Sequence, residues 1–249
     1  MYKKPILLIC FVLVLGLAGS ASGELVVHWR LDETSGTTAV DSSGNGHDGT
    51  VGGSTPNWVP GQIGGSLNLD GSSNYIDLNT RVVEGTFSFT MWLNARNLPY
   101  TTGYYAILHD DVWGAGSIHC HLRASTSLWN VEMNSGPAPS STTVLQENEW
   151  YHCAYTVTSV GNVGKIYING DYESEDSGGT GVGFLGPLNF GAWDDNGYVR
   201  FVPGIMDDIR IYDHVLTETE IEEIMLGVGR WDARNPNPAD GEADVSVET

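Results

Sequence analysis

The stretch GIMDDIRIYDHVLTETEIEEIM, residues 204–225, contains the two patterns that decide the fold. Its first ten residues are an apolar-rich run bounded by Gly and Asp, which is typical of a short strand. Its second half begins at Thr217, which forms a capping box with Glu220 ahead of Ile221 and Ile224. The stretch therefore predicts a strand followed by one short helix.

Short strand-like segments precede this stretch along most of the chain, each bounded by Gly, Asn, Asp or Pro. In ELVVHWRL, residues 24–31, alternation places Val27, Trp29 and Leu31 on one face. The other segments are GGSLNLDG (64–71), NYIDLN (74–79), FSFTMWLNA (87–95), YYAILHD (104–110), SIHCHLRA (117–124), SLWNVEMN (127–134), WYHCAYTV (150–157), GKIYINGDY (164–172) and LNFGAW (188–193). Many short strands with almost no helical periodicity predict an all-β, two-sheet sandwich with one short C-terminal helix.

Composition narrows the class of partner. The 249 residues include 31 Asp and Glu against 11 Lys and Arg, a formal net charge of −20 at pH 7. We therefore expect no nucleic acid partner, because phosphate binding needs a basic face. Aromatic residues make up 10% of the chain, so it has enough apolar surface for a core and is not a disordered acidic tail.

The first 23 residues have the order of a secretory signal peptide. Lys3 and Lys4 precede an apolar run over residues 6–17, and small residues follow it. We expect cleavage near Ala21 or Gly23. The apolar run is too short to span a bilayer, so we expect a secreted or cell-surface protein with no membrane span in the mature chain.

The rest of the chain divides in two. Residues 24–231 hold all the strand-like segments and predict one β domain. Residues 232–249 are rich in Pro, Asp and Gly and end in ADVSVET, which alternates like the start of a strand. This end predicts either a linker or the start of a further β module, and we expect additional β domains in the native polypeptide.

Two cysteines remain after the expected cleavage. Cys120 and Cys153 both lie in strand-like segments, where alternation places each on an apolar face. In an exported protein this pair predicts a disulfide. The alternative is two buried thiols that pack as small hydrophobic side chains.

Several separated motifs resemble, in the right order, the LamG-like (laminin G or concanavalin A-like) jelly roll domain of exported bacterial multidomain proteins. They are VVHWRLDETSGTTAVDSSGNGHDGTV (26–51), GGSLNLDGSSNYIDL (64–78), FSFTMWLNAR (87–96), EWYHCAYTV (149–157), GKIYINGD (164–171) and the stretch 204–225, of which MDDIRIYDHVLTETEI is the most specific. The resemblance implies a jelly roll sandwich of two antiparallel sheets, commonly with a calcium site and often with carbohydrate or protein binding.

Calcium has candidate ligands in two places. The polar loop at residues 41–48 contains Asp41 and Asn45, and Asp207 and Asp208 lie on a late strand. Ca²⁺ takes six to eight oxygen ligands, and Gly-rich turns can expose carbonyls among carboxylates. The resemblance maps Asp41 and one residue of the Asp207 and Asp208 pair onto a structural metal position. The alternative is that these side chains only form Asx turns and cap loops.

Two histidines suggest a second, weaker metal candidate. His119 and His121 are two apart on one predicted strand and so share a face, with Cys120 on the other. Zinc could bind there with Glu132 as a third ligand. The alternative is the solvated face of a strand. His152 is expected to be structural.

The sequence contains none of the catalytic motifs for which we searched. A glycosidase on a jelly roll would show two carboxylates flanking the scissile bond, but Glu242 and Asp244 lie in the tail and Val247 stands where a second Glu is needed. The mature chain has no GxSxG, HExxH or phosphate-binding loop. We therefore expect no enzyme, although carboxylates can converge from separate strands without a motif.

Sugar binding is the stronger hypothesis. Sugars stack apolar faces on aromatic rings and pair hydroxyls with Asp and Asn. Two predicted loops combine these residue types. The first contains Tyr104, Tyr105, Asp110, Asp111 and Trp113, next to Tyr100, and the second contains Trp193, Asp194, Asp195, Asn196 and Tyr198. The alternative is that these aromatics cover the ends of the sandwich.

Two classes of function therefore remain. The first is an extracellular, lectin-like module that binds a polysaccharide or a glycoprotein glycan as part of a larger exported protein. The second is a protein-interaction or spacer module of an adhesin-like surface protein. The fold does not decide between them, because one jelly roll hosts lectins, enzymes and adhesion modules.

Overall fold

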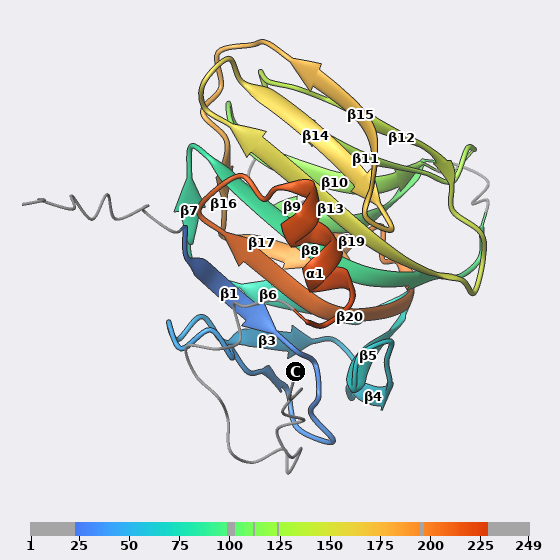
Figure 1. Cartoon of the computed structure of the whole chain (residues 1–249). Coiled ribbons are helices and arrows are strands. Elements are labelled where there is room, and N and C mark those ends of the chain that lie inside the picture. Colours follow the sequence, from blue (N-terminus) through green and yellow to red (C-terminus); the bar gives the residue numbers. More distant parts are fainter. Residues whose placement is uncertain (1–22, 99–102, 112, 124, 195–196, 229–249) are drawn as a thin grey trace, which may run out of the picture.

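The computed structural model describes residues 23–98, 103–111, 113–123, 125–194 and 197–228. Two large β-sheets face each other, and a short helix lies on the outside of one sheet (Figure 1). The fold is therefore the expected all-β antiparallel sandwich with one short C-terminal helix. The predicted signal peptide up to residue 22 and the predicted linker lie outside the described residues.

The first sheet, named sheet A, consists of eight antiparallel strands. In spatial order they are β15 (Asp171–Ser177), β14 (Val163–Ile168), β13 (Trp150–Thr158), β8 (Phe87–Ala95), β20 (Pro203–Tyr212), β5 (Gly65–Asp70) and β4 (Asn57–Pro60), with β1 (Leu25–Trp29) paired to β20 as well. The first half of β20 pairs with β5 and its second half with β1. The N-terminal strand of the domain is thus joined to its last strand.

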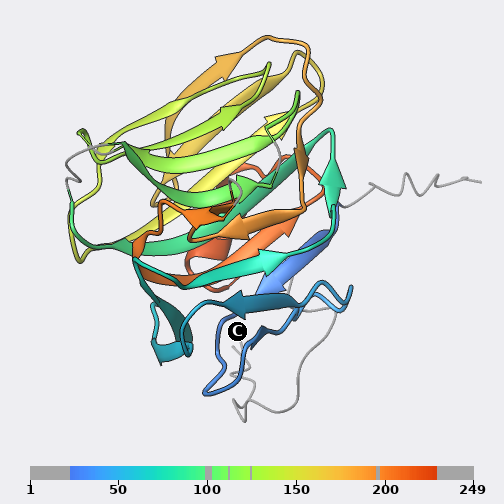
Figure 2. The same ribbon diagram turned by 180° about the vertical axis from the view of Figure 1, so that it is seen from behind.

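The second sheet, named sheet B, also has eight antiparallel strands, and Figure 2 shows it from behind the view of Figure 1. They are β12 (Ser140–Val144), β11 (Leu128–Met133), β10 (Ile118–Arg123), β9 (Tyr104–Asp110), β17 (Leu188–Phe190), β6 (Tyr75–Leu78), β3 (Gly49–Gly52) and β2 (Thr38–Ala39). Two short ladders join β7 (Val83–Glu84) to β16 (Phe184–Leu185), and β18 (Trp193–Asp194) to β19 (Tyr198–Val199).

Aromatic side chains fill the space between the sheets. Phe89 of sheet A meets Trp129 of sheet B edge to face, with ring centroids 6.1 Å apart. Trp29 packs against Phe190 in the same way at 5.4 Å. All four are completely buried. Edge-to-face packing suits their ring quadrupoles and adds to the gain from burial, so these pairs hold the two layers together.

The helix α1 (Glu218–Met225) begins where the sequence predicts. The Thr217 hydroxyl accepts from the backbone N–H of Glu220, and the Glu220 carboxylate accepts from the backbone N–H of Thr217 at 2.7 Å, which completes the capping box. Ile221 and Ile224 are buried on the outside of sheet A. Nowhere in the described ranges is a helix long and apolar enough to cross a membrane.

Side chains join the two sheets along one side of the sandwich, where β15 and β12 form the sheet edges. The Asp176 carboxylate accepts from the N–H of Ala138 at 2.9 Å, and the Ser174 hydroxyl donates to the carbonyl of Ser140 at 2.6 Å. Glu173 accepts from the N–H of Thr142 at 2.7 Å. The acidic strand β15 is thereby fixed to sheet B without a backbone ladder between them.

The predicted disulfide is wrong in this structure. Cys120 on β10 and Cys153 on β13 are both completely buried and both free. Alternation correctly placed each on the core face, but the two belong to opposite sheets. Packed sheets lie about 10 Å apart on average, and a disulfide across them forms only where two Cα atoms approach to roughly 4.4–6.8 Å. The two thiols instead pack as small hydrophobic groups, and burial raises the pKa of each.

Candidate functional site

A row of polar residues crosses the outer face of sheet B. Successive strand pairings place its members side by side, in the order Thr50, Asp77, Asn189, His109, His119 and Glu132. Sequence neighbours such as Ile76 and Phe190 are buried in the core, because alternate residues of a strand point to opposite faces. The register of the sheet therefore gathers polar groups that are far apart in the sequence.

His109 reaches this face because β9 contains a bulge. The register between β9 and β10 shifts between Cys120 and His121, which leaves Ile107 as an extra residue. Strict alternation would place Tyr105, Ile107 and His109 on the same face. Because a bulge inserts one residue, Tyr105 and Ile107 stay in the core while His109 turns to the outer face.

His109, His119 and His121, named the histidine cluster, form the centre of the site. The ring centroids of His109 and His119 lie 4.1 Å apart, and those of His109 and His121 lie 6.3 Å apart. All three side chains are buried. Both ring nitrogens of His109, Nε2 of His119 and Nδ1 of His121 have no hydrogen-bond partner among the described residues. The cluster thus offers polar atoms that the fold itself does not use.

The three imidazoles are uncharged at neutral pH. Burial lowers the pKa of His109 well below its usual value, and the charges of His119 and His121 lower it further, against a small opposite effect of the Cys120 backbone. Burial also lowers the pKa of His119 and of His121 to about 4. A neutral imidazole has one donor and one acceptor nitrogen, which suits a hydroxyl group.

Three aromatic rings lie against the histidine cluster. Measured to the nearest histidine ring, the centroid distance is 4.1 Å for Trp113, 4.6 Å for Tyr104 and 5.5 Å for Trp193. Trp113 is 48% exposed, so its ring is open to solvent. Exposed rings beside unused polar atoms are the combination that a sugar needs.

One end of the site carries three half-buried carboxylates, Asp77, Asp111 and Asp194, named the acidic end. The Asn189 amide donates to Asp111 at 2.5 Å. Burial, followed by the charges of Asp77 and Asp194, raises the pKa of Asp111 to about 6, although the hydrogen bond from Asn189 lowers it. Burial and the charge of Asp194 also raise the pKa of Asp77. The three carboxylates therefore repel one another.

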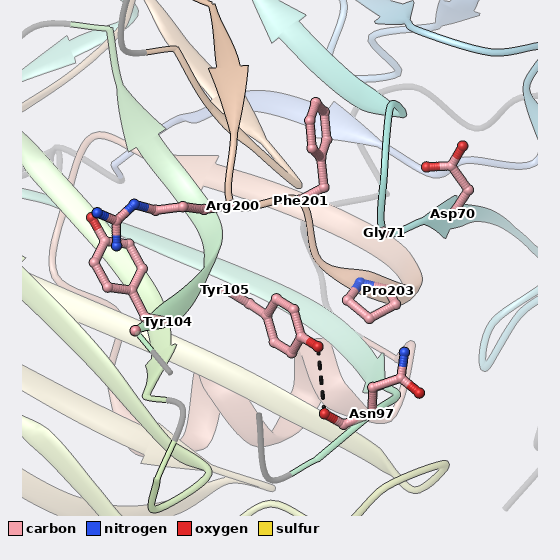
Figure 3. A pocket seen from close by; sticks show the side chains of 9 residues that line it. Asp70, Gly71, Asn97, Tyr104, Tyr105, Arg200, Phe201 and Pro203 are labelled. Carbon is pink, nitrogen blue, oxygen red and sulfur yellow. Dashed lines mark hydrogen bonds between the residues drawn. The ribbon is translucent and has the colours of Figure 1, made fainter. Parts of the chain in front are cut away.

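Arg200 closes the opposite end. Its guanidinium lies 4.0 Å from the centroid of the Tyr104 ring and 5.2 Å from that of Trp193. Figure 3 shows Arg200 beside Tyr104 at a cavity of about 470 Å³. The cavity is lined by Asp70, Gly71, Asn97, Gly103, Tyr104, Tyr105, Arg200, Phe201 and Pro203. Tyr104 and Arg200 thus connect this cavity to the aromatic rings over the histidine cluster.

The structure brings together part of the two predicted sugar-binding loops. Tyr104, Asp111 and Trp113 from the first loop lie on the same face as Trp193 and Asp194 from the second. The loops meet because β17 pairs with β9 and is followed directly by β18. Two separate segments therefore form one surface.

Other predicted residues have structural roles. Tyr105 is buried in the core, and its hydroxyl donates to the Asn97 carbonyl at 3.4 Å. Asp110 is completely buried and accepts from the backbone N–H groups of Ile118 at 2.5 Å and Gly186 at 2.8 Å. Burial raises the pKa of Asp110 to about 7. Both side chains support the sheet from its core side.

The second loop is described only in part. Asp195 and Asn196 lie outside the described residues, as does Tyr100 of the first loop. Tyr198 belongs to β19, whose backbone pairs it with Asp194.

Sequence reasoning missed four residues of the site, Asp77, Asn189, His109 and Arg200, and no sequence pattern pointed to Arg200. Asp77 and Asn189 lie between core residues of their strands, so alternation could have placed both on the outer face. That Asp77 and Asn189 lie close to the two loops could not be predicted from the sequence, because it depends on the order of the strands in sheet B. For His109, strict alternation along β9 predicts the core face, whereas the bulge turns the side chain to the outer face.

The zinc hypothesis gains no support. His119 and His121 share the outer face as predicted, but that face is buried beneath aromatic rings rather than solvated. Within the part of the chain that the structure describes, no group of three or more His, Cys, Asp or Glu is arranged to hold a metal ion.

Asp41 and Asn45 organise their own loop. The Asp41 carboxylate accepts from the N–H groups of His28 at 3.0 Å, Ser43 at 2.9 Å and His47 at 2.9 Å. Burial acts to raise the pKa of Asp41, but these hydrogen bonds outweigh it and the pKa is lowered. The Asn45 amide donates to the carbonyls of Leu25 and Val26, both on β1. The bond to Ser43 is that of an Asx turn.

Asp207 and Asp208 also have hydrogen-bond or ion-pair partners within the chain. Asp208 accepts from Nε of Arg210 at 3.1 Å and lies 2.7 Å from Nε2 of His28, and these partners lower its pKa against the effect of burial. Asp207 accepts two backbone N–H groups of the turn at 62–63, and burial raises its pKa to about 7. The four residues thus do not form a ready cation site, and calcium binding stays a prediction.

The sequence of the chain matches the model of a known protein family. Residues 70–222 match the Laminin_G_3 family, described as the Concanavalin A-like lectin/glucanases superfamily. No curated protein matches the chain in sequence.

Solved structures share the fold at low sequence identity. Domain 4 of AbnA, an extracellular arabinanase from Geobacillus stearothermophilus in complex with arabinotriose, has a TM-score of 0.65 and 22% identity, over 82% of this chain and 98% of that one. The botulinum neurotoxin type G receptor binding domain has a TM-score of 0.61 and 17% identity, over 82% and 51%. Trypanosoma rangeli sialidase in complex with sialic acid has 0.60 and 16%, over 82% and 33%. At these identities the likeness concerns the fold, and with the family match over more than half of its length the chain belongs to the concanavalin A-like lectin/glucanase superfamily.

Proposed function

We propose that the chain is a non-catalytic carbohydrate-binding module of a larger exported protein, and that it binds a glycan on the outer face of sheet B. The observation that carries this proposal is the histidine cluster with Trp113, Tyr104 and Trp193 around it. Buried imidazole nitrogens without a partner are costly unless a ligand or water satisfies them. A sugar supplies an apolar face for the exposed Trp113 ring and, once a covering ring moves aside, hydroxyls for these buried nitrogens.

The fold neighbours support the same class of ligand. The arabinanase domain that matches nearly over its whole length was solved with arabinotriose bound. Arabino-oligosaccharides are therefore the first ligands to try on this chain, followed by other neutral polysaccharides.

Isothermal titration calorimetry with the full chain tests the proposal. Arabinotriose and a panel of plant and bacterial polysaccharides are titrated into the wild type and into Trp113→Ala. We expect one glycan class to bind, and Trp113→Ala to weaken binding by about tenfold, which corresponds to about 1.4 kcal/mol. The reason is that the exposed Trp113 ring is the surface on which a sugar would stack.

Tyr172→Ala is the matched control. Tyr172 on β15 is 46% exposed, close to the 48% of Trp113, but it belongs to the other sheet. Its removal should leave glycan affinity unchanged. Silence of the folded wild type across the whole panel would contradict the proposal and favour a protein-interaction or spacer module. Release of new reducing ends from the bound glycan would contradict the non-catalytic role.

A further inference from the structure

The acidic end of the site combines groups that come from three separate segments. Asp77 lies on β6, Asp111 follows β9, and Asp194 lies on β18. None of the three forms an ion pair with another described residue. The guanidinium of Arg200, at the opposite end of the site, lies over Tyr104 and Trp193. Three like charges are therefore held together without a balancing cation from the described part of the fold.

A second observation points to a missing donor at the same place. Asn189 is 1% exposed, and its amide nitrogen donates to Asp111. The Asn189 carbonyl oxygen Oδ1 is buried and has no partner among the described residues. A buried acceptor without a donor loses its hydrogen bonds to water without replacement, so a ligand that donates to it would gain affinity.

The unused groups at this end are nearly all acceptors. Ionised carboxylates and an amide oxygen accept hydrogen bonds and cannot donate them. A sugar hydroxyl offers a single donor, whereas a protonated amine offers three donors, no acceptor and a positive charge. An ammonium also gains from a nearby aromatic face, and the Trp193 ring packs against His109, the strand neighbour of Asn189.

We propose that the acidic end binds the protonated amine of an amino sugar, with Asp111, Asp194 and the Asn189 carbonyl as its acceptors. This inference rests on the proposed function, because the rest of the sugar would stack on the aromatic rings beside the histidine cluster. The raised pKa values of Asp77 and Asp111 agree with it, since a bound cation relieves repulsion among carboxylates. The described residues form no metal-binding group, so an amine fits better than a metal ion.

Calorimetry with matched sugars tests the inference on the full chain. Glucosamine oligomers with free amines and N-acetylglucosamine oligomers of the same length are titrated at about pH 7. Charge-assisted hydrogen bonds are stronger than neutral ones, so we expect the free amine to bind at least about tenfold more tightly. Asp111→Asn and Asp194→Asn should each remove most of this preference.

Two controls separate the site from general charge attraction. Asp171→Asn removes the same charge from the exposed strand β15 of sheet A and should keep the preference intact. Thermal melting checks the fold, and Asp111→Asn should melt no lower than the wild type because it removes a repelled carboxylate. Equal loss of preference in Asp171→Asn would overturn the inference.

The outcomes also separate this inference from the proposed function. Equal affinity for the acetylated and free-amine oligomers, with both weakened by Trp113→Ala, would refute amine recognition and leave sugar binding in place. Binding of a neutral glycan, with no binding of the free-amine or the acetylated oligomer, would also refute amine recognition and leave sugar binding in place. Failure of every sugar to bind would refute both.

Discussion

His109, His119 and His121 show how a position on a sheet changes the chemistry of a residue. Each lies on the outer face of sheet B, where a side chain is normally solvated, yet aromatic rings cover all three and keep them uncharged. Neutral imidazoles do not repel a cationic or a neutral ligand. The cluster therefore places polar atoms beneath the aromatic rings without adding charge to the site.

Asp111 should make stability depend on pH. Its pKa is about 6 in the folded chain, above the usual value, so the folded state binds a proton more tightly than the unfolded state. This contribution to stability is present below the unfolded pKa and is lost as the pH rises through about 6. Because Asp111 is only half-buried, solvent screening reduces the effect, and we expect about 1 kcal/mol.

The measurement is denaturant unfolding of wild type and Asp111→Asn at about pH 5 and pH 7. The free energy of unfolding of the wild type should fall more between these values than that of Asp111→Asn. Asp171→Asn serves as the control and should behave like the wild type. Identical pH dependence in the wild type and in Asp111→Asn would show that the carboxylates at the acidic end do not interact as described.

At the scale of elements, the capping box sets where α1 begins. Thr217→Ala removes the hydroxyl that accepts from Glu220, and its loss should lower the free energy of unfolding by about 1 kcal/mol. Thr219→Ala, at an exposed position inside the helix, should be neutral or slightly stabilising because Ala has the higher helix propensity. Chemical denaturation of both variants measures the difference, and equal stability would exclude a role for the cap.

The same scale shows what the sequence could predict. Alternation and turn residues were sufficient for most of the longer strands but not for β3, β4, β12 and most of β15, which the sequence analysis did not predict. The Thr217 and Glu220 spacing was sufficient for the helix. The position of His109 could not be predicted, because a bulge is a property of pairing with β10 and leaves no local pattern. The free state of Cys120 and Cys153 could not be predicted either, because alternation places both in the core without fixing how closely the two thiols approach.

The candidate site was predictable only in part for a related reason. The two loops were recognisable from their mixture of aromatic and acidic residues. Their meeting point follows from the neighbours of β17, a three-residue strand between β6 and β9 that also contributes Asn189. Which short strands become neighbours is decided by the packing of the whole sandwich, so a single segment could not reveal it.

At the scale of the whole molecule, a net charge of −20 should make stability sensitive to salt. Raising NaCl from about 10 mM to about 300 mM shortens the screening length from about 30 Å to well under 10 Å. Weaker self-repulsion should then raise the melting temperature by about 2–4 °C, which corresponds to about 1 kcal/mol.

Differential scanning calorimetry at two pH values checks the origin of this effect. Near pH 4.4, the isoelectric point of the chain, the same increase in salt should leave the melting temperature almost unchanged. A salt effect of equal size at both pH values would assign it to hydration instead of charge.

The side-chain bonds between β15 and β12 affect how copies of the molecule meet. An unpaired strand edge is a template on which other chains can add strands and aggregate. Here Glu173, Ser174 and Asp176 of β15 bind backbone groups around β12 through their side chains, so the edge of sheet B on this side of the sandwich is already occupied. The acidic residues of β15 also repel the same strand of another copy. Copies of the protein at high local concentration should therefore not associate edge to edge through this side of the sandwich.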